Sequence, residues 1–364
     1  MASWRQQPTI TTTTRPYAVA AMKLNINPPL INSACPWATT LDDLRALYHN
    51  PHTGGVTTRT HTLTGFPHDD AVHQYAFFDI NKGAAAPLKR PDSDLASDGA
   101  APETDPAATT SANTLGYSPI PLATTLEHIH TLAKENPPRT DKPIIVSVTG
   151  SPGELIECYR LVSAAARAVP IPLLLEVNLS CPNIAGRAPP AYDTRALREY
   201  LLVLRNAAAE EEEHGEVTVP MGLKVPPYTN PVQFSELQRA LLGVPYPSPV
   251  AFVTATNTLW PGLLLNEGGR PALYSETGEG VGGMGGVGLH TVALGNVRML
   301  RRTLDLVPTL AGIRIIGVGG VKDRAGFERM KAAGADVVGV ATALGRRGVG
   351  VFGEILDGGR GSRL

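Results

Sequence analysis

The chain has 364 residues, of which 43% are hydrophobic and 18% are charged, and its formal net charge at pH 7 is -1. This length is enough for one large hydrophobic core or two modest ones, and the near-zero charge provides no basic surface of the kind that binds nucleic acid. No apolar run approaches the roughly 20 residues that a membrane-spanning helix needs. We therefore expect no nucleic-acid partner and no membrane partner.

The N-terminal residues 1–27 are rich in threonine and lack the uninterrupted apolar core of a secretory signal. We expect them to form a flexible N-terminal segment, with organelle targeting as the alternative. The three cysteines, Cys35, Cys158 and Cys181, are odd in number and widely spaced. That pattern argues against a disulfide framework and favours a reducing compartment.

Eight short apolar runs predict strands, and several are apolar almost throughout, as in strands covered on both faces. In chain order they are Leu30–Ser33, Gly55–Arg59, Ile144–Thr149, Leu173–Leu179, Met221–Val225, Ala251–Thr256, Ile313–Val318 and Val337–Val340. Helical periodicity predicts helices between them, at Thr40–Tyr48, Ala123–Lys134, Glu154–Ala168, Thr194–Glu212, Pro231–Leu241, Leu289–Leu304 and Ala325–Ala333. Three of these helices are predicted to have N-caps, at Thr40, Asp193 and Asp323.

Eight strands that alternate with helices predict an α/β protein with a single-domain (β/α)8 TIM barrel over residues 28–358. A doubly wound open sheet is the competing arrangement, but polar clusters follow nearly every strand and do not gather at one switch point. Residues 81–112 are rich in Ala, Pro, Asp, Ser and Thr, so we expect a disordered low-complexity insertion within the barrel. Residues 359–364 are expected to be a C-terminal tail.

The C-terminal ends of barrel strands build the active site of such folds. Polar residues at these ends are Arg59, Asn178, Cys181, Asn183, Lys224, Asn257 and Thr258. After the seventh strand, Gly319 and Gly320 would let a phosphate approach the backbone, although glycines also serve simply to make tight turns. Another glycine-dense loop, Gly278–His290, could pack its backbone on a flat ring.

Lys224 stands alone on an apolar strand. A buried ammonium needs an anionic or electron-rich partner, such as a reduced flavin, unless the side chain reaches solvent. Cys181 follows Ser180 and precedes Pro182, so it lies in a loop where its thiolate could act as a base; the alternative is a small buried hydrophobic residue. The asparagines beside it suit a planar ligand edged with C=O and N–H groups, such as a pyrimidine.

These residues carry a resemblance to a known family. The motif EVNLSCPNIAGRAPPAYD is followed by GLKVPPY, TNTLWPGL, GGMGG with ALGNVR downstream, IIGVGGV and ATAL. In this order the motifs resemble those of the class 1A, fumarate-dependent dihydroorotate dehydrogenases, over about Leu30 to Leu356. The resemblance implies an FMN-dependent oxidation of (S)-dihydroorotate to orotate, in the biosynthesis of pyrimidines and UMP.

The resemblance also implies roles for single residues. Cys181 would be the base that takes the C5 proton while a hydride passes from C6 to flavin N5, and Arg59 and Lys224 would assist as cations. The implied substrate-binding residues are Arg59, Asn113, Leu115, Gly116, Asn178, Asn183, Asn257 and Thr258. The implied FMN-binding residues are Ser33, Ala34, Lys224, Gly283, Gly319, Gly320, Ala341 and Thr342. No metal is implied.

Fumarate is the electron acceptor that the resemblance implies, and the enzyme would be a cytoplasmic homodimer.

Several positions depart from the family pattern. Arg59 replaces a lysine, Cys35 and Ala341 replace glycines, and the loop NTLGYSP replaces NSMGLPN near the substrate. The chain ends at GGRGSRL without the terminal helix expected of the family. Two alternatives therefore stand: a related FMN barrel that acts on another cyclic amide or pyrimidine, and a non-catalytic flavin-binding paralogue.

Overall fold

The computed structural model describes residues 24–82, 105–135, 140–180, 189–213, 218–245 and 248–358. Eight parallel strands form one sheet in the order β1-β12-β11-β8-β7-β6-β5-β2. They are β1 (Leu30–Asn32), β2 (Val56–Thr57), β5 (Ile144–Val148), β6 (Leu173–Asn178), β7 (Met221–Val225), β8 (Val250–Ala255), β11 (Arg314–Val318) and β12 (Val337–Val340). A parallel bridge between Ile31 and Gly55 joins the two ends of this order. The sheet is thus closed, which confirms the TIM barrel and excludes the doubly wound alternative.

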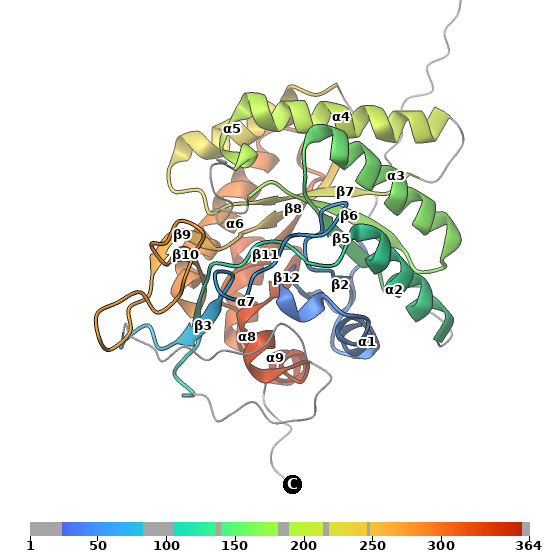
Figure 1. Cartoon of the computed structure of the whole chain (residues 1–364). Coiled ribbons are helices and arrows are strands. Elements are labelled where there is room, and N and C mark those ends of the chain that lie inside the picture. Colours follow the sequence, from blue (N-terminus) through green and yellow to red (C-terminus); the bar gives the residue numbers. More distant parts are fainter. Residues whose placement is uncertain are drawn as a thin grey trace, which may run out of the picture.

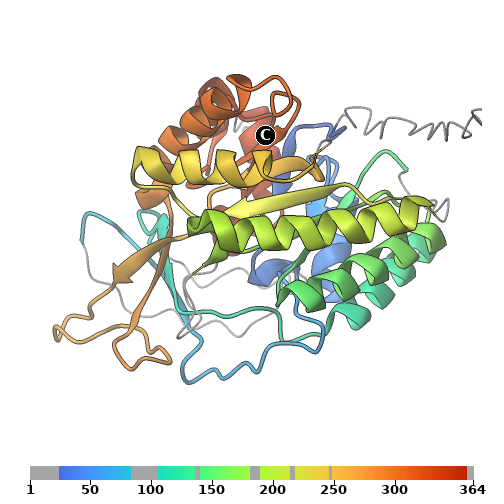
Figure 2. The ribbon, with the colours of Figure 1, turned by 90° about the horizontal axis from the view of Figure 1, so that it is seen from above.

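Helices cover the outside of the barrel. They are α1 (Leu41–His49), α2 (Leu122–Glu135), α3 (Pro152–Ala168), α4 (Thr194–Glu213), α5 (Pro231–Leu242), α6 (His290–Asp305), α7 (Arg324–Ala333), α8 (Thr342–Arg347) and α9 (Val351–Asp357), with 3-10 turns η1 (Pro36–Ala38), η2 (Pro190–Tyr192) and η3 (Val287–Leu289). Figure 2 shows α3, α4 and α5 following one another along one side of the sheet. No described helix is long and apolar enough to cross a bilayer.

The three predicted N-caps are confirmed. The side-chain oxygen of Thr40 accepts a hydrogen bond from the Asp43 N–H at 3.1 Å. Asp193 accepts from the Ala196 N–H at 2.7 Å, and Asp323 accepts from the Gly326 N–H at 2.8 Å. Each bond satisfies one of the N–H groups that the first turn of a helix leaves without an intrahelical partner.

The side chains inside the barrel change from apolar to polar along the strands. The layer farther from the C-terminal ends of the strands is apolar and includes Ile31, Ile145, Leu174 and Phe252. A Cβ on Gly222 would lie 2.1 Å from the Phe252 ring, so the large ring fits only because its neighbour is glycine. Because side chains alternate along a strand, the inward side chains after Leu174 in β6 are Glu176 and Asn178. Polar groups are therefore concentrated toward the C-terminal ends of the strands.

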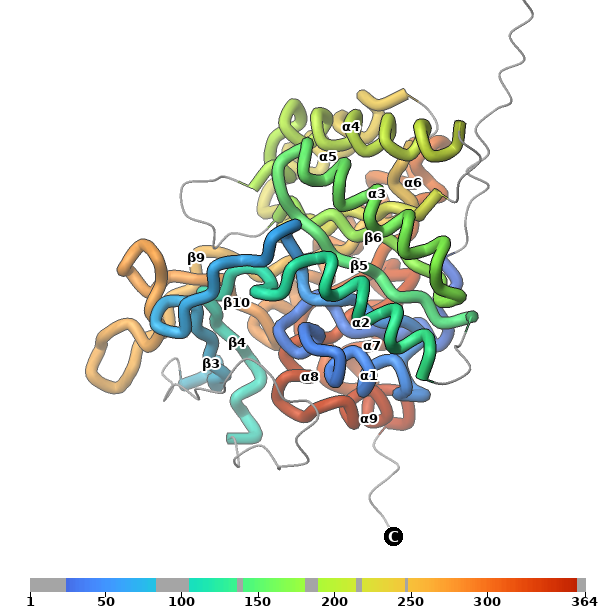
Figure 3. Tube along the Cα trace, turned by 45° about the vertical axis from the view of Figure 1, so that its right-hand side comes forward, coloured from blue at the N-terminus to red at the C-terminus, as the bar shows by residue number. Residues whose placement is uncertain are grey.

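A second, antiparallel sheet in the order β3-β4-β10-β9 stands beside the barrel. Its strands are β3 (Tyr75–Phe78), β4 (Thr110–Asn113), β9 (Leu259–Leu263) and β10 (Val281–Gly286). Figures 1 and 3 both show β3, β9 and β10 together on one side of the molecule. The sequence patterns did not predict this sheet.

Two predicted boundaries are wrong. The insertion was placed at 81–112, but residues 110–112 belong to β4, which hydrogen-bonds to both β3 and β10. The boundary was misplaced because the small and polar residues of β4 have the composition of a loop. Residues 83–104 lie outside the described residues. The flexible N-terminal segment was placed at 1–27, but Ile26 is 6% exposed and packs with the interior layer of the barrel. Residues 1–23 and 359–364 also lie outside the description.

Candidate functional site

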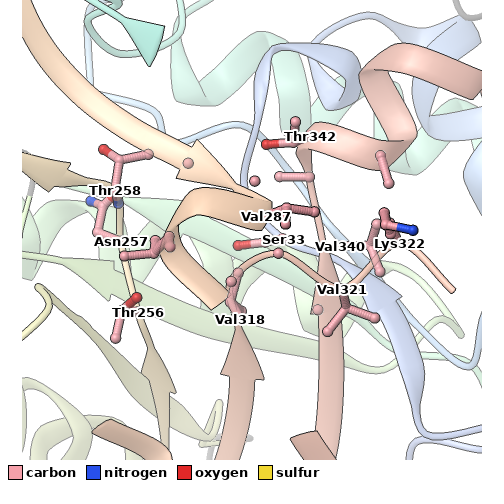
Figure 4. A pocket seen from close by; sticks show the side chains of 18 of the residues that line it. Ser33, Thr256, Asn257, Thr258, Val287, Val318, Val321, Lys322, Val340 and Thr342 are labelled. Carbon is pink, nitrogen blue, oxygen red and sulfur yellow. The ribbon is translucent and has the colours of Figure 1, made fainter. Parts of the chain in front are cut away.

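Two adjoining cavities open at the C-terminal ends of the barrel strands. The first has a volume of about 570 Å³ and the second about 790 Å³, each including space open to solvent. Six residues bound both, so the two form one continuous hollow: Ala34, Lys224, Asn257, Thr258, Ala341 and Thr342. In Figure 4, which looks into the first cavity, Thr256, Asn257 and Thr258 lie on one side, with Val340 and Thr342 across from them.

A glycine turn forms part of the wall of the first cavity. Gly319 and Gly320 follow β11 with φ angles of +140° and +69°, which side-chain-bearing residues rarely adopt. A Cβ on Gly319 would lie 2.4 Å from the Cβ of Ala293, and one on Gly320 would lie 2.6 Å from the carbonyl oxygen of Gly286. Backbone conformation and packing therefore both require glycine, and the turn presents bare peptide groups to the cavity.

The polar groups of the first cavity fit the phosphorylated flavin that the sequence resemblance implies. Thr256 is 2% exposed, and within the described ranges its hydroxyl has no hydrogen-bond partner. A buried hydroxyl without a partner is costly, so a ligand that hydrogen-bonds to it would stabilise the site. Ser33 adds a second hydroxyl to the wall, beside the apolar side chains of Val318 and Val340.

Lys224 lies where the two cavities meet. It is 5% exposed, and its Nζ is 3.4 Å from Ser33 Oγ and 3.5 Å from the carbonyl oxygen of Ala34, both long for hydrogen bonds. Among the described residues, no carboxylate lies within ion-pair distance of this ammonium. A buried cation in this situation favours an anionic or electron-rich ligand.

Amide side chains line the second cavity. Asn178 donates from Nδ2 to Thr60 Oγ1 at 3.0 Å, and its Oδ1 accepts from both the N–H (3.2 Å) and the hydroxyl (2.9 Å) of Ser180. Asn257 donates from Nδ2 to Ser180 Oγ at 3.0 Å. Asn113, on β4, donates to the carbonyl oxygen of Gly283 at 3.1 Å. These bonds fix the orientation of each amide before a ligand arrives.

A buried carboxylate lies beneath these amides. Glu176 is 1% exposed and accepts hydrogen bonds from Ser147 Oγ at 2.9 Å and from Thr254 Oγ1 at 2.6 Å. Ser147 Oγ lies 3.0 Å from Thr60 Oγ1, which in turn accepts from Asn178. Since a carboxylate accepts and each hydroxyl passes the bond on, Glu176 stabilises the donor orientation of Asn178.

Aromatic side chains also line the second cavity. Trp37 stacks on Phe77, with ring centroids 5.8 Å apart, and meets the edge of Tyr75 at 5.6 Å. Tyr117 from the NTLGYSP loop also lines this cavity. So does Cys35, where burial raises the pKa of the thiol to about 12, so it remains protonated at neutral pH.

Most of the predicted site residues meet in this hollow. Those that line one or both cavities are Ser33, Ala34, Arg59, Asn113, Leu115, Gly116, Asn178, Lys224, Asn257, Thr258, Gly319, Gly320, Ala341 and Thr342. Gly283 lies beside the lining, where a Cβ would come 2.1 Å from Thr258 Oγ1. Cys181 and Asn183 lie outside the described residues.

Four polar residues in or beneath the hollow were not predicted from the sequence: Thr60 and Ser111 line the second cavity, and Ser147 and Glu176 lie beneath it. Ser111 Oγ lies 2.9 Å from Thr342 Oγ1 and so links the second sheet to the barrel. The one signal in the sequence was a glutamate inside the apolar run LLLEVN.

In the described part of the chain, no three His, Cys, Asp or Glu side chains are grouped so that they could hold a metal.

Comparisons with known proteins point to one family. The family model described as dihydroorotate dehydrogenase matches residues 101–359. The chain is 32% identical over 218 residues to a dihydroorotate dehydrogenase (fumarate) of Trypanosoma cruzi, covering 59% of the chain and 62% of that protein. It is 34% identical over 185 residues to a putative dihydroorotate dehydrogenase A (fumarate) of Streptococcus uberis, covering 50% of the chain and 52% of the relative. The matches thus span between half and two thirds of these relatives.

A solved structure shares the fold. A crystal structure of a dihydroorotate dehydrogenase from Eimeria tenella in complex with ferulenol matches 90% of the chain and 79% of its own length. The TM-score is 0.62 and the sequence identity is 16%. At that identity the match supports the barrel fold alone.

Proposed function

The chain belongs to the dihydroorotate dehydrogenase family, and on that premise we propose that it oxidises (S)-dihydroorotate to orotate with FMN as cofactor and fumarate as electron acceptor. The observation that carries this proposal is the continuity of the two cavities. A glycine-lined cavity with a buried cation meets an amide-lined cavity at Lys224. This is the arrangement that a phosphorylated flavin and a cyclic amide substrate need if their rings are to meet.

The residues of the first cavity would bind the cofactor. The turn Gly319–Gly320 and the residues Ala341 and Thr342 would bind the phosphate, whereas Ser33 and Ala34 would lie against the ring system. Bound FMN would supply a two-electron acceptor for the hydride of the substrate. The ammonium of Lys224 would stabilise negative charge that develops at this point of the hollow.

The residues of the second cavity would bind and orient the substrate. Asn178, whose Oδ1 is already saturated by Ser180, has one N–H left to donate to a ring carbonyl. Asn113, Asn183, Asn257 and Thr258 would complete the amide contacts. The guanidinium of Arg59, which is 4% exposed and lines the cavity, would neutralise the substrate carboxylate together with the backbone of Leu115 and Gly116.

Cys181 would be the general base that accepts the C5 proton. Family membership and its position two residues after the buried Leu179 support this assignment. Cys35, in contrast, lines the cavity with a thiol whose raised pKa, about 12, makes it a poor base at neutral pH.

A substitution at Cys181 tests the proposed mechanism. A Cys181→Ser variant should retain FMN but reduce it with dihydroorotate at least about 100-fold more slowly, because general-base catalysis contributes on that order. Stopped-flow measurement of flavin bleaching gives the rate. A Cys35→Ser variant is the control and should keep the rate within a few-fold. Equal reduction rates in wild type and Cys181→Ser would show that Cys181 is not the base.

Another cyclic amide is the second candidate substrate. The aromatic wall of the second cavity, including Tyr117 in the altered NTLGYSP loop, favours it because such a wall also suits a ring without a carboxylate. Comparison of dihydroorotate with dihydrouracil as reductants distinguishes the two candidates.

We also propose a cytoplasmic homodimer. The location follows from the resemblance to the class 1A family. Exposed apolar side chains on and near β9 support self-association: Trp260 and Leu263 are each 54% exposed and Tyr274 is 66% exposed. Analytical ultracentrifugation should give twice the monomer mass, whereas a single 38.5 kDa species would contradict the dimer.

A further inference from the structure

The glycine turn of the first cavity rests on His290, the first residue of α6. His290 is 8% exposed, and its Nδ1 lies 2.7 Å from the carbonyl oxygen of Gly319. A Cβ built on Gly320 would lie 2.8 Å from the Cβ of His290. The imidazole is therefore in direct contact with the turn, and His290 is not one of the residues that line the two cavities.

Arg329, on α7, determines which imidazole nitrogen carries the proton. Its Nε donates to His290 Nε2 at 3.1 Å. A guanidinium can only donate, so Nε2 is the accepting nitrogen and the ring is neutral. The proton is then on Nδ1, and the short contact with Gly319 is a hydrogen bond from Nδ1–H to the carbonyl oxygen.

This bond also sets the direction of the next N–H. The peptide between Gly319 and Gly320 is planar and trans, so its N–H points opposite to its C=O. The Gly319 carbonyl points at His290, and the Gly320 N–H therefore points away from α6, toward the cavity that both glycines line. Among acceptors in the described ranges, none receives this N–H.

We propose that His290 is a positioning residue for the flavin phosphate. By holding the Gly319 carbonyl, it keeps the Gly320 N–H directed at a phosphate oxygen. Without this bond, a peptide between two glycines with positive φ is free to rotate, because neither residue has a side chain that restricts it. The inference rests on the proposed function, since it takes FMN as the ligand of the first cavity.

The test compares FMN with riboflavin, which carries the same ring and ribityl chain but no phosphate. Apoprotein of the full chain is titrated with each flavin, and Kd is read from quenching of flavin fluorescence. A His290→Leu variant should bind FMN about tenfold more weakly, the effect of losing one hydrogen bond to a charged group, and should bind riboflavin within about twofold of wild type. A His290→Asn variant, whose Nδ2 can reach the same carbonyl, should retain FMN affinity within about threefold.

An Arg329→Leu variant separates the hydrogen bond from the nearby positive charge. It should stay within about threefold of wild type for FMN, since the Gly319 carbonyl still selects the protonated Nδ1. If Arg329→Leu loses as much FMN affinity as His290→Leu does, the effect is due to the positive charge, and this result would overturn the proposal. So would equal weakening of FMN and riboflavin in His290→Leu, which would indicate a general structural role.

The inference and the function it rests on fail in different ways. Wild-type protein that binds the two flavins equally would contradict the phosphate site itself. Wild-type protein that prefers FMN, together with a His290→Leu variant that keeps the same preference, would contradict the role of His290 alone.

Discussion

His61 illustrates how single polar residues support the mouth of the barrel. It follows β2, its N–H donates to the Ser147 carbonyl at 2.9 Å, and its own carbonyl accepts from Thr149 at 2.9 Å. Its Nδ1 lies 2.9 Å from the carbonyl oxygen of Ile120, so the neutral ring donates there. Burial lowers the pKa of this imidazole to about 4, with the Ile120 bond opposing the shift only in part.

The lowered pKa predicts a pH dependence of stability. Because the pKa of His61 is lower in the folded state than the usual value of about 6.5, the unfolded chain binds more protons between these two values. The contribution of His61 to the free energy of unfolding should therefore be complete above pH about 6.5. It should fall by on the order of 2–3 kcal/mol as the pH drops toward 4. Urea unfolding across this pH range measures the loss.

A His61→Asn variant isolates the contribution of the buried ring. Its Nδ2 can still donate to Ile120, but it does not titrate, so its stability should vary less with pH over the same window. An exposed His130→Asn variant controls for loss of one histidine and should follow wild type. If His61→Asn and wild type lose stability in parallel, His61 is not the group responsible.

At the scale of elements, the second sheet positions part of the site. Strand β10 pairs with β4, which brings Gly283 opposite Asn113. The absence of a side chain at Gly283 leaves room for Thr258, since a Cβ there would lie 2.1 Å from Thr258 Oγ1. The substrate side of the hollow therefore depends on the glycine content of a strand outside the barrel.

A Gly283→Ala substitution should displace Thr258 and weaken orotate binding at least about tenfold, as expected when a packed side chain must move to relieve a clash. Isothermal titration with orotate gives the affinity. The control is Gly295→Ala in α6, where a Cβ meets nothing within 4 Å. This exposed helix position should leave orotate affinity unchanged and raise stability by about 0.5–1 kcal/mol. Normal orotate affinity in Gly283→Ala would contradict this view of β10.

The two sheets also differ in how far the sequence predicts them. The barrel strands are largely apolar, and each of the eight was predicted within about two residues of its observed bounds. Strands β4 and β10 read TSAN and VGGMGG, without apolar alternation. They are strands because they pair with each other, and pairing between residues about 170 positions apart leaves no local pattern.

For the whole molecule, the barrel topology explains why the site could be predicted well. Parallel strands carry the residues after their C-terminal ends to one rim, so residues from Ser33 to Thr342 could be assigned to one hollow before any contact was known. The hydrogen bonds from Glu176 through Ser147 and Thr60 to Asn178 could not. They depend on which side chains face each other across the barrel, and spacing along the chain does not specify this.

The central claim is that one hollow brings a flavin and dihydroorotate together. Anaerobic mixing of purified holoprotein with dihydroorotate tests it most directly, with dihydrouracil as the comparison. We predict that dihydroorotate bleaches the flavin absorbance within seconds at stoichiometric concentration and that dihydrouracil does not. A flavin that stays oxidised with dihydroorotate, or that dihydrouracil bleaches as fast, would contradict the account.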